Sequence, residues 1–336
     1  MRVLIAGGTT GTHVGASWLR SAVELGHEAR LLDAAEAYRG PAPLRALAWR
    51  MGRRPLGLAR YSKSVSDTVK EWRPDLFLSA GVSPVTERTL RQMDPAVRKA
   101  VYLTDDPWNA SHRAAWQLKA ITAYDQVYTT KTALEPDLKR LGCRQVSYLP
   151  FAYDPEHFHP AESVDPVERA RYASEVLFYG GADNDRVLLI KSLINQSVPM
   201  TLYGGYWERD PLTRAHWRGQ VGPQVLRQAI AGAAINLCLV RRSNRDGHSM
   251  RSFEIPAVGG CLIAEDTAEH RALYGEDGRC VRYFKGITDA AALIRRLLDA
   301  PEERRRLAEA AHRLIRSGGH TYTDRLRAIL EAGRIS

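Results

Sequence analysis

The chain has 336 residues, 44% hydrophobic and 26% charged, which is typical of a soluble globular protein and predicts two domains of about 150 residues each. No run of about 18 apolar residues occurs, so no transmembrane helix is expected. The N-terminus "MRVLIAGG" lacks a signal-peptide pattern, and the four scattered cysteines lack metal-ligand spacing. These features predict a cytoplasmic protein.

The chain is strongly basic. The formal net charge is +10 and the isoelectric point is about 9.5. A positive surface attracts anionic partners, and nucleotide phosphates, anionic lipid head groups and nucleic acid all qualify. Charge alone does not choose among them.

The first half of the chain alternates apolar strand patterns with helical patterns. Strands are predicted at residues 2–7, 28–33, 75–80, 100–105, 126–130 and 145–150. Helices are predicted between most of them, for example at residues 12–28, 111–123 and 132–141. This alternation is typical of a doubly wound parallel sheet, and it predicts a Rossmann-like domain over residues 1–150.

The segment from Leu149 to Pro166 interrupts this pattern with four prolines and little periodicity, which predicts an interdomain linker over residues 151–172. The alternation then restarts. Strands are predicted at residues 175–181, 199–205, 234–240 and 261–266, and helices at 185–195, 223–233, 290–298, 301–315 and 322–331. A second Rossmann-like domain is therefore expected over residues 173–318, followed by a C-terminal helical segment over 319–336.

Four glycine-rich turns follow predicted strands. They are "AGGTTGTH" (6–13), "SAG" (79–81), "YGGADNDR" (179–186) and "YGGYW" (203–207). Ligands of open α/β sheets bind outside the carboxyl ends of strands, where glycine lets backbone N–H groups approach a phosphate. Because each half contributes two such turns, both domains are expected to present backbone to one cleft.

The first glycine turn does not match the dinucleotide fingerprint. Gly7, Gly8 and Gly11 do not give the spacing G-x-G-x-x-G. Asp33 nevertheless follows a strand, where a ribose-binding acid of an NAD site would lie. An NAD-dependent enzyme therefore remains an alternative, although it leaves the glycine turns of the second half unexplained.

The stretch "MRSFEIPAVGGCLIAED" (250–266) places Glu254 inside a short apolar segment before a glycine turn. This segment and "VLFYGGADNDR", "TLYGGYW" and "GGHTYTDRLRAIL" occur in the order found in the C-terminal domain of CgeB-like (spore maturation) glycosyltransferases, a GT-B group that they resemble. In the first half, "VYLTDDPWN" and "DQVYTTKTALEPDLKRLGCRQVSYLPFAYDPEHF" are similar to the N-terminal domain of the same family. The opening turn is also similar to lipid-linked GlcNAc transferases.

The resemblance implies a GT-B fold of two Rossmann-like domains facing across a cleft. The C-terminal domain would bind a nucleotide-sugar, the N-terminal domain an acceptor, and the last helix would pack back on the N-terminal domain. In related retaining enzymes the second of two acids eight positions apart binds the ribose, and the first lies near the sugar and leaving phosphate. Glu254 matches the second acid, and Asp246 stands at the first in place of the usual glutamate.

The chemistry of the residues agrees with that assignment. A carboxylate can accept both ribose hydroxyls, a helix start places N–H groups at a diphosphate, and arginine binds phosphate bidentately. With this many arginines, no metal is expected. The residues assigned to donor binding are Gly8, Thr9, Gly181, Arg186, Gly205, Tyr206, Arg241, Asp246, Met250, Arg251, Ser252 and Glu254.

Three residues are candidates for the catalytic base. Asp105 and Asp106 end a predicted strand of the first domain, and neighbouring carboxylates raise one another's pKa. The alternative is that one of them caps a helix near Trp108 and the other is solvated. His13, after the first glycine turn, is the rival base, and a capping or packing role competes with it.

A basic stretch stands apart from the donor motifs. Residues 39–63 contain seven basic residues and no acid, with leucine, tryptophan and methionine interleaved. This pattern fits a helix at an anionic membrane surface, at the inner face of the membrane, or a solvated basic flap or acceptor-binding loop.

We therefore predict a glycosyltransferase that uses a nucleotide-sugar. The resemblance favours retention of anomeric configuration, and inversion stays open. The acceptor class is open: small molecule, glycan, lipid or protein. A sugar-nucleotide epimerase and an NAD-dependent enzyme are the enzyme alternatives. A basic nucleic-acid-binding protein is the non-enzyme alternative, although no motif for nucleic-acid recognition is present.

Overall fold

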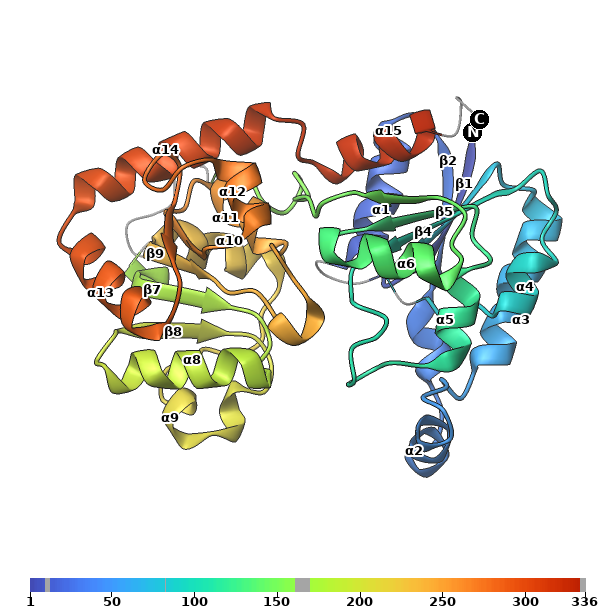
Figure 1. The fold of residues 1–336 in the computed structure, drawn as a ribbon, viewed down its shortest axis with the longest axis horizontal. Helices are drawn as coiled ribbons and strands as arrows, with labels where there is room; N and C mark the ends of the chain where they lie inside the picture. Colours follow the sequence, from blue (N-terminus) through green and yellow to red (C-terminus); the bar gives the residue numbers. More distant parts are fainter. Residues whose placement is uncertain (10–12, 82, 161–169, 333–336) are drawn as a thin grey trace. The chain divides into compact units, whose positions relative to one another are not determined.

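The computed structural model describes residues 1–9, 13–81, 83–160 and 170–332. The chain divides into two compact units, Met1–Pro150 with Tyr322–Ser336 (unit 1) and Phe151–Thr321 (unit 2), and each is described by itself (Figure 1). Gly11 of the first glycine turn and residues 161–169 of the predicted linker lie outside the described residues.

Unit 1 contains the six strands predicted in the first half of the chain. They are β1 (Arg2–Gly7), β2 (Glu28–Asp33), β3 (Leu76–Ala80), β4 (Arg98–Leu103), β5 (Gln126–Thr129) and β6 (Val146–Tyr148). All neighbours pair in parallel in the order β2-β1-β3-β4-β5-β6. The central strands are apolar on both faces because helices cover both, as expected for a parallel sheet.

The helices of unit 1 are α1 (Val14–Glu24), α2 (Ala42–Arg50), α3 (Leu58–Trp72), α4 (Glu87–Arg91), α5 (Ala115–Ile121), α6 (Glu135–Leu141) and α15 (Tyr322–Ala332). Helix α15, the last of the chain, packs on α1. The ring of Trp18 meets that of Tyr322 edge-on at 5.5 Å, and the Thr323 hydroxyl donates to Glu24 at 2.7 Å.

One helix prediction for unit 1 needs correction, and one long helix was not predicted. The helix expected at residues 111–123 is shorter, because residues 106–112 form turns and α5 begins at Ala115. Helix α3 was not predicted, although Leu58, Tyr61, Val65 and Val69 recur at helical spacing and are buried. The surrounding basic residues obscure this apolar face in the sequence.

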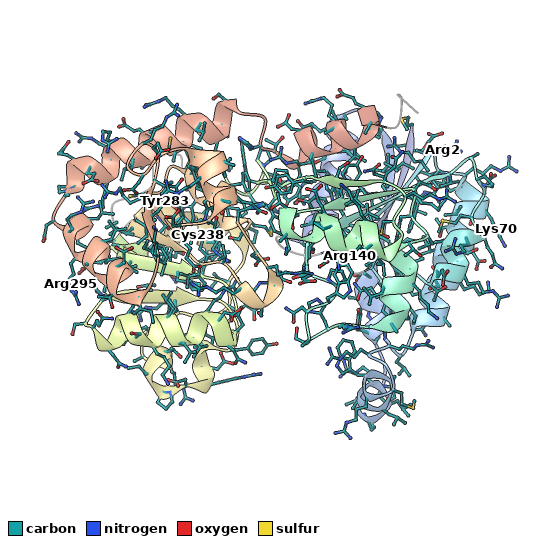
Figure 2. The ribbon with its side chains drawn as sticks, viewed as in Figure 1. Arg2, Lys70, Arg140, Cys238, Tyr283 and Arg295 are labelled. Atoms are coloured by element: carbon teal, nitrogen blue, oxygen red, sulfur yellow. The ribbon has the colours of Figure 1, made fainter. Side chains whose placement is uncertain are left out.

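Unit 2 contains a five-stranded parallel sheet in the order β11-β10-β9-β7-β8. The strands are β7 (Ser174–Tyr179), β8 (Met200–Tyr203), β9 (Ala233–Cys238), β10 (Leu262–Glu265) and β11 (Arg282–Phe284). Figure 2 shows Cys238 inside this unit and Arg295 at its periphery, in agreement with the complete burial of Cys238.

The helices of unit 2 are α8 (Asn184–Asn195), α9 (Pro211–Arg214), α10 (Pro223–Gly232), α11 (Arg251–Val258), α12 (Ala268–Tyr274), α13 (Ile287–Leu298) and α14 (Pro301–Ser317). Most match the predicted helices within a few residues. Strand β11 and helix α12 were not predicted, because three and seven residues are too short to establish a period.

Each sheet has one point where successive strands are added on opposite sides of the first strand. In unit 1 this switch point lies between β1 and β3, and in unit 2 between β7 and β9. Connecting helices on opposite faces leave a crevice at the carboxyl ends of such strand pairs. These two places are where the fold itself predicts ligands.

Candidate functional site

The glycine turns after β7 and β8 lie directly against one another. The Gly180 amide donates to the Tyr203 carbonyl at 2.9 Å, and the Ala182 amide donates to the Gly205 carbonyl at 2.9 Å. Gly204 has a φ of +122°, and a Cβ there would overlap the Gly180 carbonyl. Glycine is therefore required at Gly204 for the two turns to approach one another.

The residues that follow the second turn have opposite surroundings. Trp207 is fully buried, and its indole N–H donates to the Gly180 carbonyl at 2.8 Å, so it is a core residue. Tyr206 is 54% exposed and adopts a φ of +75°, which is unusual for a bulky residue. Its ring lies 4.1 Å from the guanidinium of Arg209. The strained backbone thus presents an aromatic ring to solvent beside the glycine turns.

Arg251 spans the switch point of unit 2. It is the first residue of α11 and is only 8% exposed. One terminal nitrogen donates to the Tyr179 carbonyl and the other to the Leu239 carbonyl, both at 3.1 Å. These carbonyls lie at the carboxyl ends of β7 and β9, so one guanidinium bridges the two strands between which the fold predicts a ligand.

Arg186 lies beside Arg251 on the first turn of α8. A Cβ on Gly180 would lie 2.9 Å from an Arg251 nitrogen and 3.4 Å from an Arg186 nitrogen, and both guanidiniums lie over the ring of Phe178. Arg186 donates to the Gly181 carbonyl at 3.1 Å and pairs with Asp183 at 3.3 Å.

The two guanidiniums keep positive charge and hydrogen-bond donors that the neighbouring residues do not use. The Nε atoms of both are buried, and neither makes a hydrogen bond to the described part of the chain. Within those same residues, no carboxylate lies within ion-pair distance of Arg251. Burial, and then the neighbouring Arg251, lower the pKa of Arg186 to about 9. Two like charges in a buried place with unused donors favour an anion between them.

Glu254 lies one turn along α11 from this pair and is 3% exposed. The Tyr179 hydroxyl donates to its carboxylate at 2.8 Å. Burial raises the pKa of Glu254 to about 7, against the lowering effects of the Tyr179 hydrogen bond and of Arg251. The predicted donor-site acid is thus a buried group beside the arginine pair, poised to titrate near neutral pH.

Asp246 has a role within its own loop. One carboxylate oxygen accepts from the backbone and side chain of Arg241, at 3.3 and 3.2 Å, and the other accepts from the Asn244 amide at 2.7 Å. Asp246 therefore orients Arg241, whose side chain is about one-third exposed. The position expected for an acid near the sugar is occupied by a loop-forming residue, and Arg242 points to the exposed side, 3.5 Å from Glu265.

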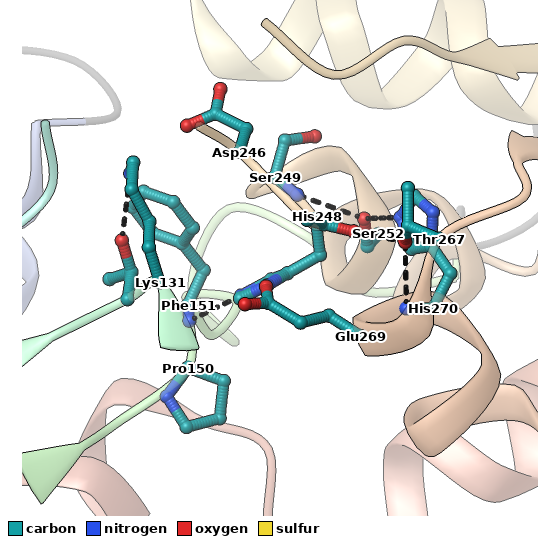
Figure 3. A network of polar contacts seen from close by, with 12 residues as sticks. Lys131, Pro150, Phe151, Asp246, His248, Ser249, Ser252, Thr267, Glu269 and His270 are labelled. Atoms are coloured by element: carbon teal, nitrogen blue, oxygen red, sulfur yellow. Dashed lines mark hydrogen bonds and ion pairs between the residues drawn. The ribbon is translucent and has the colours of Figure 1, made fainter. Parts of the chain in front are cut away.

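Ser252 was expected to offer its amide to a diphosphate, and the structure gives it another role. Its amide donates to the Ser249 carbonyl at 3.0 Å, and its hydroxyl accepts from the Ser249 amide at 3.1 Å and contacts His270 at 2.9 Å. Figure 3 shows this internal network, in which Thr267 caps the helix that carries His270. Met250 lies half-buried just before α11, and its carbonyl accepts the Glu254 amide at 2.9 Å.

His248 is a residue that sequence reasoning missed. It is 2% exposed, its Nδ1 lies 2.6 Å from the Glu269 carboxylate, and its Nε2 accepts the Phe151 amide at 3.0 Å (Figure 3). Because a backbone amide can only donate, Nε2 is unprotonated and Nδ1 carries the proton. His248 thereby fixes the start of unit 2 to the loop that precedes α11.

A cavity of about 450 Å³ lies at the carboxyl edge of the unit 2 sheet. Its lining includes Asp185, Leu239, Val240, Glu265 and Lys285. Leu239 is also the residue whose carbonyl accepts from Arg251, so this cavity adjoins the arginine pair.

Unit 1 carries its own cavity of about 430 Å³ at the β1/β3 switch point. Gly8, Thr9, His13, Gly81 and Thr104 are part of its lining. Gly8 and Thr9, predicted to bind the donor, thus group with the predicted base His13 in unit 1, while the other ten predicted donor residues belong to unit 2.

The neighbouring acids after β4 are distinct from one another. Asp106 is 3% exposed and accepts the Trp108 amide at 2.9 Å, so it stabilises a turn rather than the start of the expected helix. Asp105 is partly exposed and accepts from the hydroxyl of Thr104, which lines the cavity, at 3.2 Å. Lys131, also missed, donates to the Thr104 carbonyl at 2.7 Å and so fixes this loop.

Two further observations concern the described residues alone. Among them, no three His, Cys, Asp or Glu side chains are grouped as metal ligands would be. None of their helices has the length and apolar character needed to cross a membrane.

Comparison with known proteins identifies the fold and a family segment. A family model described as "Glycosyl transferase-like" matches residues 186–331. No protein with curated annotation matches the chain.

Solved structures resemble the whole chain. Sucrose-phosphate synthase from Thermosynechococcus elongatus is 13% identical with a TM-score of 0.75, covering 100% of this chain and 99% of that one. HepE from Anabaena in complex with UDP is 13% identical with a TM-score of 0.67, covering 100% of both. A candidate UDP-N-acetylglucosamine 2-epimerase from Listeria monocytogenes is 10% identical with a TM-score of 0.58, covering 99% and 96%.

These comparisons confirm the predicted fold class, which is two parallel-sheet α/β domains of the GT-B type. The predicted enzyme class, a glycosyltransferase, agrees with the family match over residues 186–331. The narrower assignment to the CgeB-like group stays a prediction.

Proposed function

We propose that this chain transfers a sugar from a nucleotide-sugar donor to an acceptor and that unit 2 binds the donor. The observation that carries this proposal is the buried pair Arg186 and Arg251 at the β7/β9 switch point. A diphosphate supplies the anion that Arg251 lacks among the described residues, and the glycine turns let it approach the backbone. HepE, which shares the fold, is described in complex with UDP and with UDP-glucose, so a uridine nucleotide is the first donor to test.

The arginine pair also has a chemical role in the proposal. When the bond between the anomeric carbon and the diphosphate oxygen breaks, negative charge develops on the leaving diphosphate. Preorganised guanidiniums stabilise that charge, and they do so most strongly in a site that excludes water. Arg186 and Arg251 supply this stabilisation without a metal ion. Transfer is therefore expected to continue in the presence of EDTA.

Glu254 completes the donor site in this proposal. As a carboxylate it accepts hydrogen bonds from the two ribose hydroxyls, an arrangement that an amide side chain reproduces only in part. Its place on α11 beside Arg251 sets the ribose next to the diphosphate. Tyr206, exposed after β8, offers its ring to the nucleobase.

Unit 1 takes the acceptor in this proposal. The acceptor hydroxyl oxygen forms the new bond to the anomeric carbon, the nucleoside diphosphate leaves, and the hydroxyl proton passes to a base. Asp105 and His13 are the two candidates, because Asp106 is already committed to the Trp108 amide. Retention of anomeric configuration is part of the proposal and follows from the resemblance to CgeB-like enzymes.

Epimerisation of a sugar nucleotide is the second candidate function. It is favoured by the likeness to the candidate 2-epimerase, which has the same fold. An epimerase would change the sugar of the donor at one carbon, whereas a transferase releases the nucleoside diphosphate. Incubation with UDP-N-acetylglucosamine and UDP-glucose, followed by chromatography of the products, separates the two reactions.

The donor site is tested by thermal unfolding with UDP, GDP, dTDP, ADP, CDP and NAD. A ligand present at about 100 times its Kd stabilises the folded state by about 2.7 kcal/mol, which is readily measured as a rise in Tm. One nucleoside diphosphate is expected to stabilise the wild type and not Glu254→Ala. Glu175→Ala is the matched control, since Glu175 is exposed on β7 and outside the site. Stabilisation by NAD alone, or by none of the six, contradicts the proposal.

A further inference from the structure

Helix α2 is exposed on every side. None of its nine residues is buried. Five large apolar side chains on this helix and the turn after it are exposed: Leu44 (50%), Leu47 (52%), Trp49 (40%), Met51 (67%) and Leu56 (40%). Single exposed apolar residues are ordinary, but a group of this size marks an interaction surface. A helix of nine residues is also only marginally stable in water without a partner.

The fold pins this helix at both ends of its segment. The Gly57 amide donates to the Ala37 carbonyl at 2.8 Å and closes the segment at its base. The Trp116 indole donates to the Arg53 carbonyl at 3.1 Å, and the Arg53 guanidinium donates to the Ala110 carbonyl. Residues 38–56 are therefore presented as an anchored projection, here called the α2 projection, and Figure 1 shows α2 set apart from the sheet of its unit.

The charges of this surface all have one sign. Residues 39–63 contain seven basic residues and no acid. Two of them pair with acids outside this range, Arg39 with Glu36 at 3.7 Å and Lys63 with Asp67 at 2.5 Å. Of the others, Arg45, Arg50, Arg53 and Arg54 belong to the α2 projection and Arg60 to the first turn of α3, and none of them forms an ion pair with any residue of the described chain. The surface thus carries uncompensated positive charge around exposed apolar groups.

The spacing of residues along α2 places its apolar and basic side chains on different sides of the helix. Leu44, Leu47 and Met51 lie three and four positions apart and share one face of the helix. Arg45 and Arg50 fall on either side of that stripe. Arginine keeps its charged group in water while its stem covers apolar surface. Trp49 falls on the opposite side of the helix from this stripe. This is the arrangement of a helix that lies in the surface of a membrane.

We propose that the α2 projection binds the surface of an anionic lipid bilayer. Leu44, Leu47 and Met51 enter the boundary between head groups and acyl chains, and the flanking arginines pair with lipid phosphates. The charge of the surface selects a lipid partner of negative charge over an uncharged one. This inference does not depend on the proposed donor site, since the surface belongs to unit 1 and is tested by binding and not by catalysis.

Flotation of the full chain with lipid vesicles tests the proposal. The protein is expected to float with vesicles of phosphatidylglycerol and phosphatidylcholine at low salt, to float far less with phosphatidylcholine alone, and to be released by added salt. Each arginine near the surface contributes about fivefold in affinity, so Arg45→Gln with Arg50→Gln is expected to weaken binding about 25-fold. The matched control is Arg306→Gln with Arg316→Gln, which removes the same charge from α14.

A second pair of variants tests the apolar stripe. Leu47→Ser with Met51→Ser is expected to weaken vesicle binding at least tenfold, while Leu188→Ser, at a residue 72% exposed on α8, leaves it unchanged. The variants of the α2 projection are expected to keep the wild-type Tm, since α2 buries no residue.

Three outcomes overturn the proposal. The first is equal flotation with charged and uncharged vesicles. The second is loss of binding in the α14 control equal to that in the α2 variant. The third is a dimer in solution that the serine variants dissociate, without vesicle binding by the wild type, because α2 would then cover a second copy of the chain.

Discussion

At the switch point of unit 1, between β1 and β3, a glycine turn and small side chains surround a cavity of about 430 Å³. At the corresponding point of unit 2, between β7 and β9, the guanidinium of Arg251 bridges the strand ends and Arg186 lies beside it. The two sheets follow the same rules of connection, and each has a cavity near this point, yet two buried guanidiniums lie at the strand ends of unit 2 alone among the described residues. Topology therefore locates a ligand site, and the side chains at that place decide what kind of ligand it takes.

The largest expected effect is on turnover and concerns the candidate catalytic base in unit 1. Asp105→Asn is expected to lower turnover by about 100-fold or more, because a positioned base contributes about 10²–10⁴-fold, and to leave UDP affinity unchanged. Turnover is measured as UDP release from UDP-glucose with water in place of the acceptor. Asp106→Asn is the matched control, since asparagine can still accept the Trp108 amide. A loss in the Asp106 variant alone, or in His13→Ala alone, moves the base to that residue.

The next effect concerns the charge in unit 2. Arg251→Met is expected to weaken UDP binding by about 100-fold, which corresponds to the upper range for hydrogen bonds to charged groups, about 3 kcal/mol. Isothermal titration measures the change. His13→Ala, at the cavity of unit 1, is expected to bind UDP as the wild type does. If both variants lose UDP affinity equally, the proposal that unit 2 binds the donor and unit 1 the acceptor is wrong.

A smaller effect, of about tenfold, is expected for pH. Burial raises the pKa of Glu254 to about 7 from an ordinary value of 4.5, so Glu254 changes from a neutral acid to a carboxylate as pH rises through 7. UDP affinity is expected to rise between about pH 6 and about pH 8, relative to Glu254→Gln at each pH. Dividing by the variant removes the ionisation of UDP itself, and a ratio that stays constant with pH contradicts the ribose role.

The same pKa shift sets the direction in which the free energy of unfolding changes with pH. The folded protein holds a proton on Glu254 over the range from about 4.5 to about 7, where the unfolded chain has released it. The contribution of this group to the free energy of unfolding therefore falls as pH rises through that window. Urea denaturation at several pH values, with Glu254→Gln as reference, measures it.

The strands and glycine turns could be predicted because their signals are local. A strand buried on both faces is a continuous apolar run, and a glycine turn follows it directly. The placement of Arg251 and Glu254 close together could be predicted because they share one short segment before the turn at Gly259, whereas their roles toward a donor stay predictions. The roles of Ser252 and Asp246 could not, because whether a polar side chain faces a ligand or its own loop depends on neighbours such as Asn244 and His270.

Lys131 and His248 escaped prediction for a related reason. The partner of Lys131 lies 27 residues away at Thr104, and that of His248 lies 21 residues away at Glu269. A single polar residue at the end of a strand gives no local pattern that points to such a partner. Segments without a long apolar period, such as β11 and α12, were missed because the sheet and not the local sequence stabilises them.

The smallest expected effect concerns the nucleobase and refines the account of unit 2. Tyr206→Ala is expected to weaken UDP binding by about fivefold, the lower range for an aromatic ring stacked on a base, since the ring is half exposed and already contacts Arg209. Inorganic diphosphate, which has no base, is expected to bind both proteins equally, because the arginine pair is untouched. Competition of each ligand against a fluorescent nucleotide gives the two affinities. Equal losses of affinity for UDP and for diphosphate would mean that Tyr206 supports the glycine turn after β8 and does not contact the base. In that case the charge of Arg186 and Arg251 would be the source of affinity at this switch point.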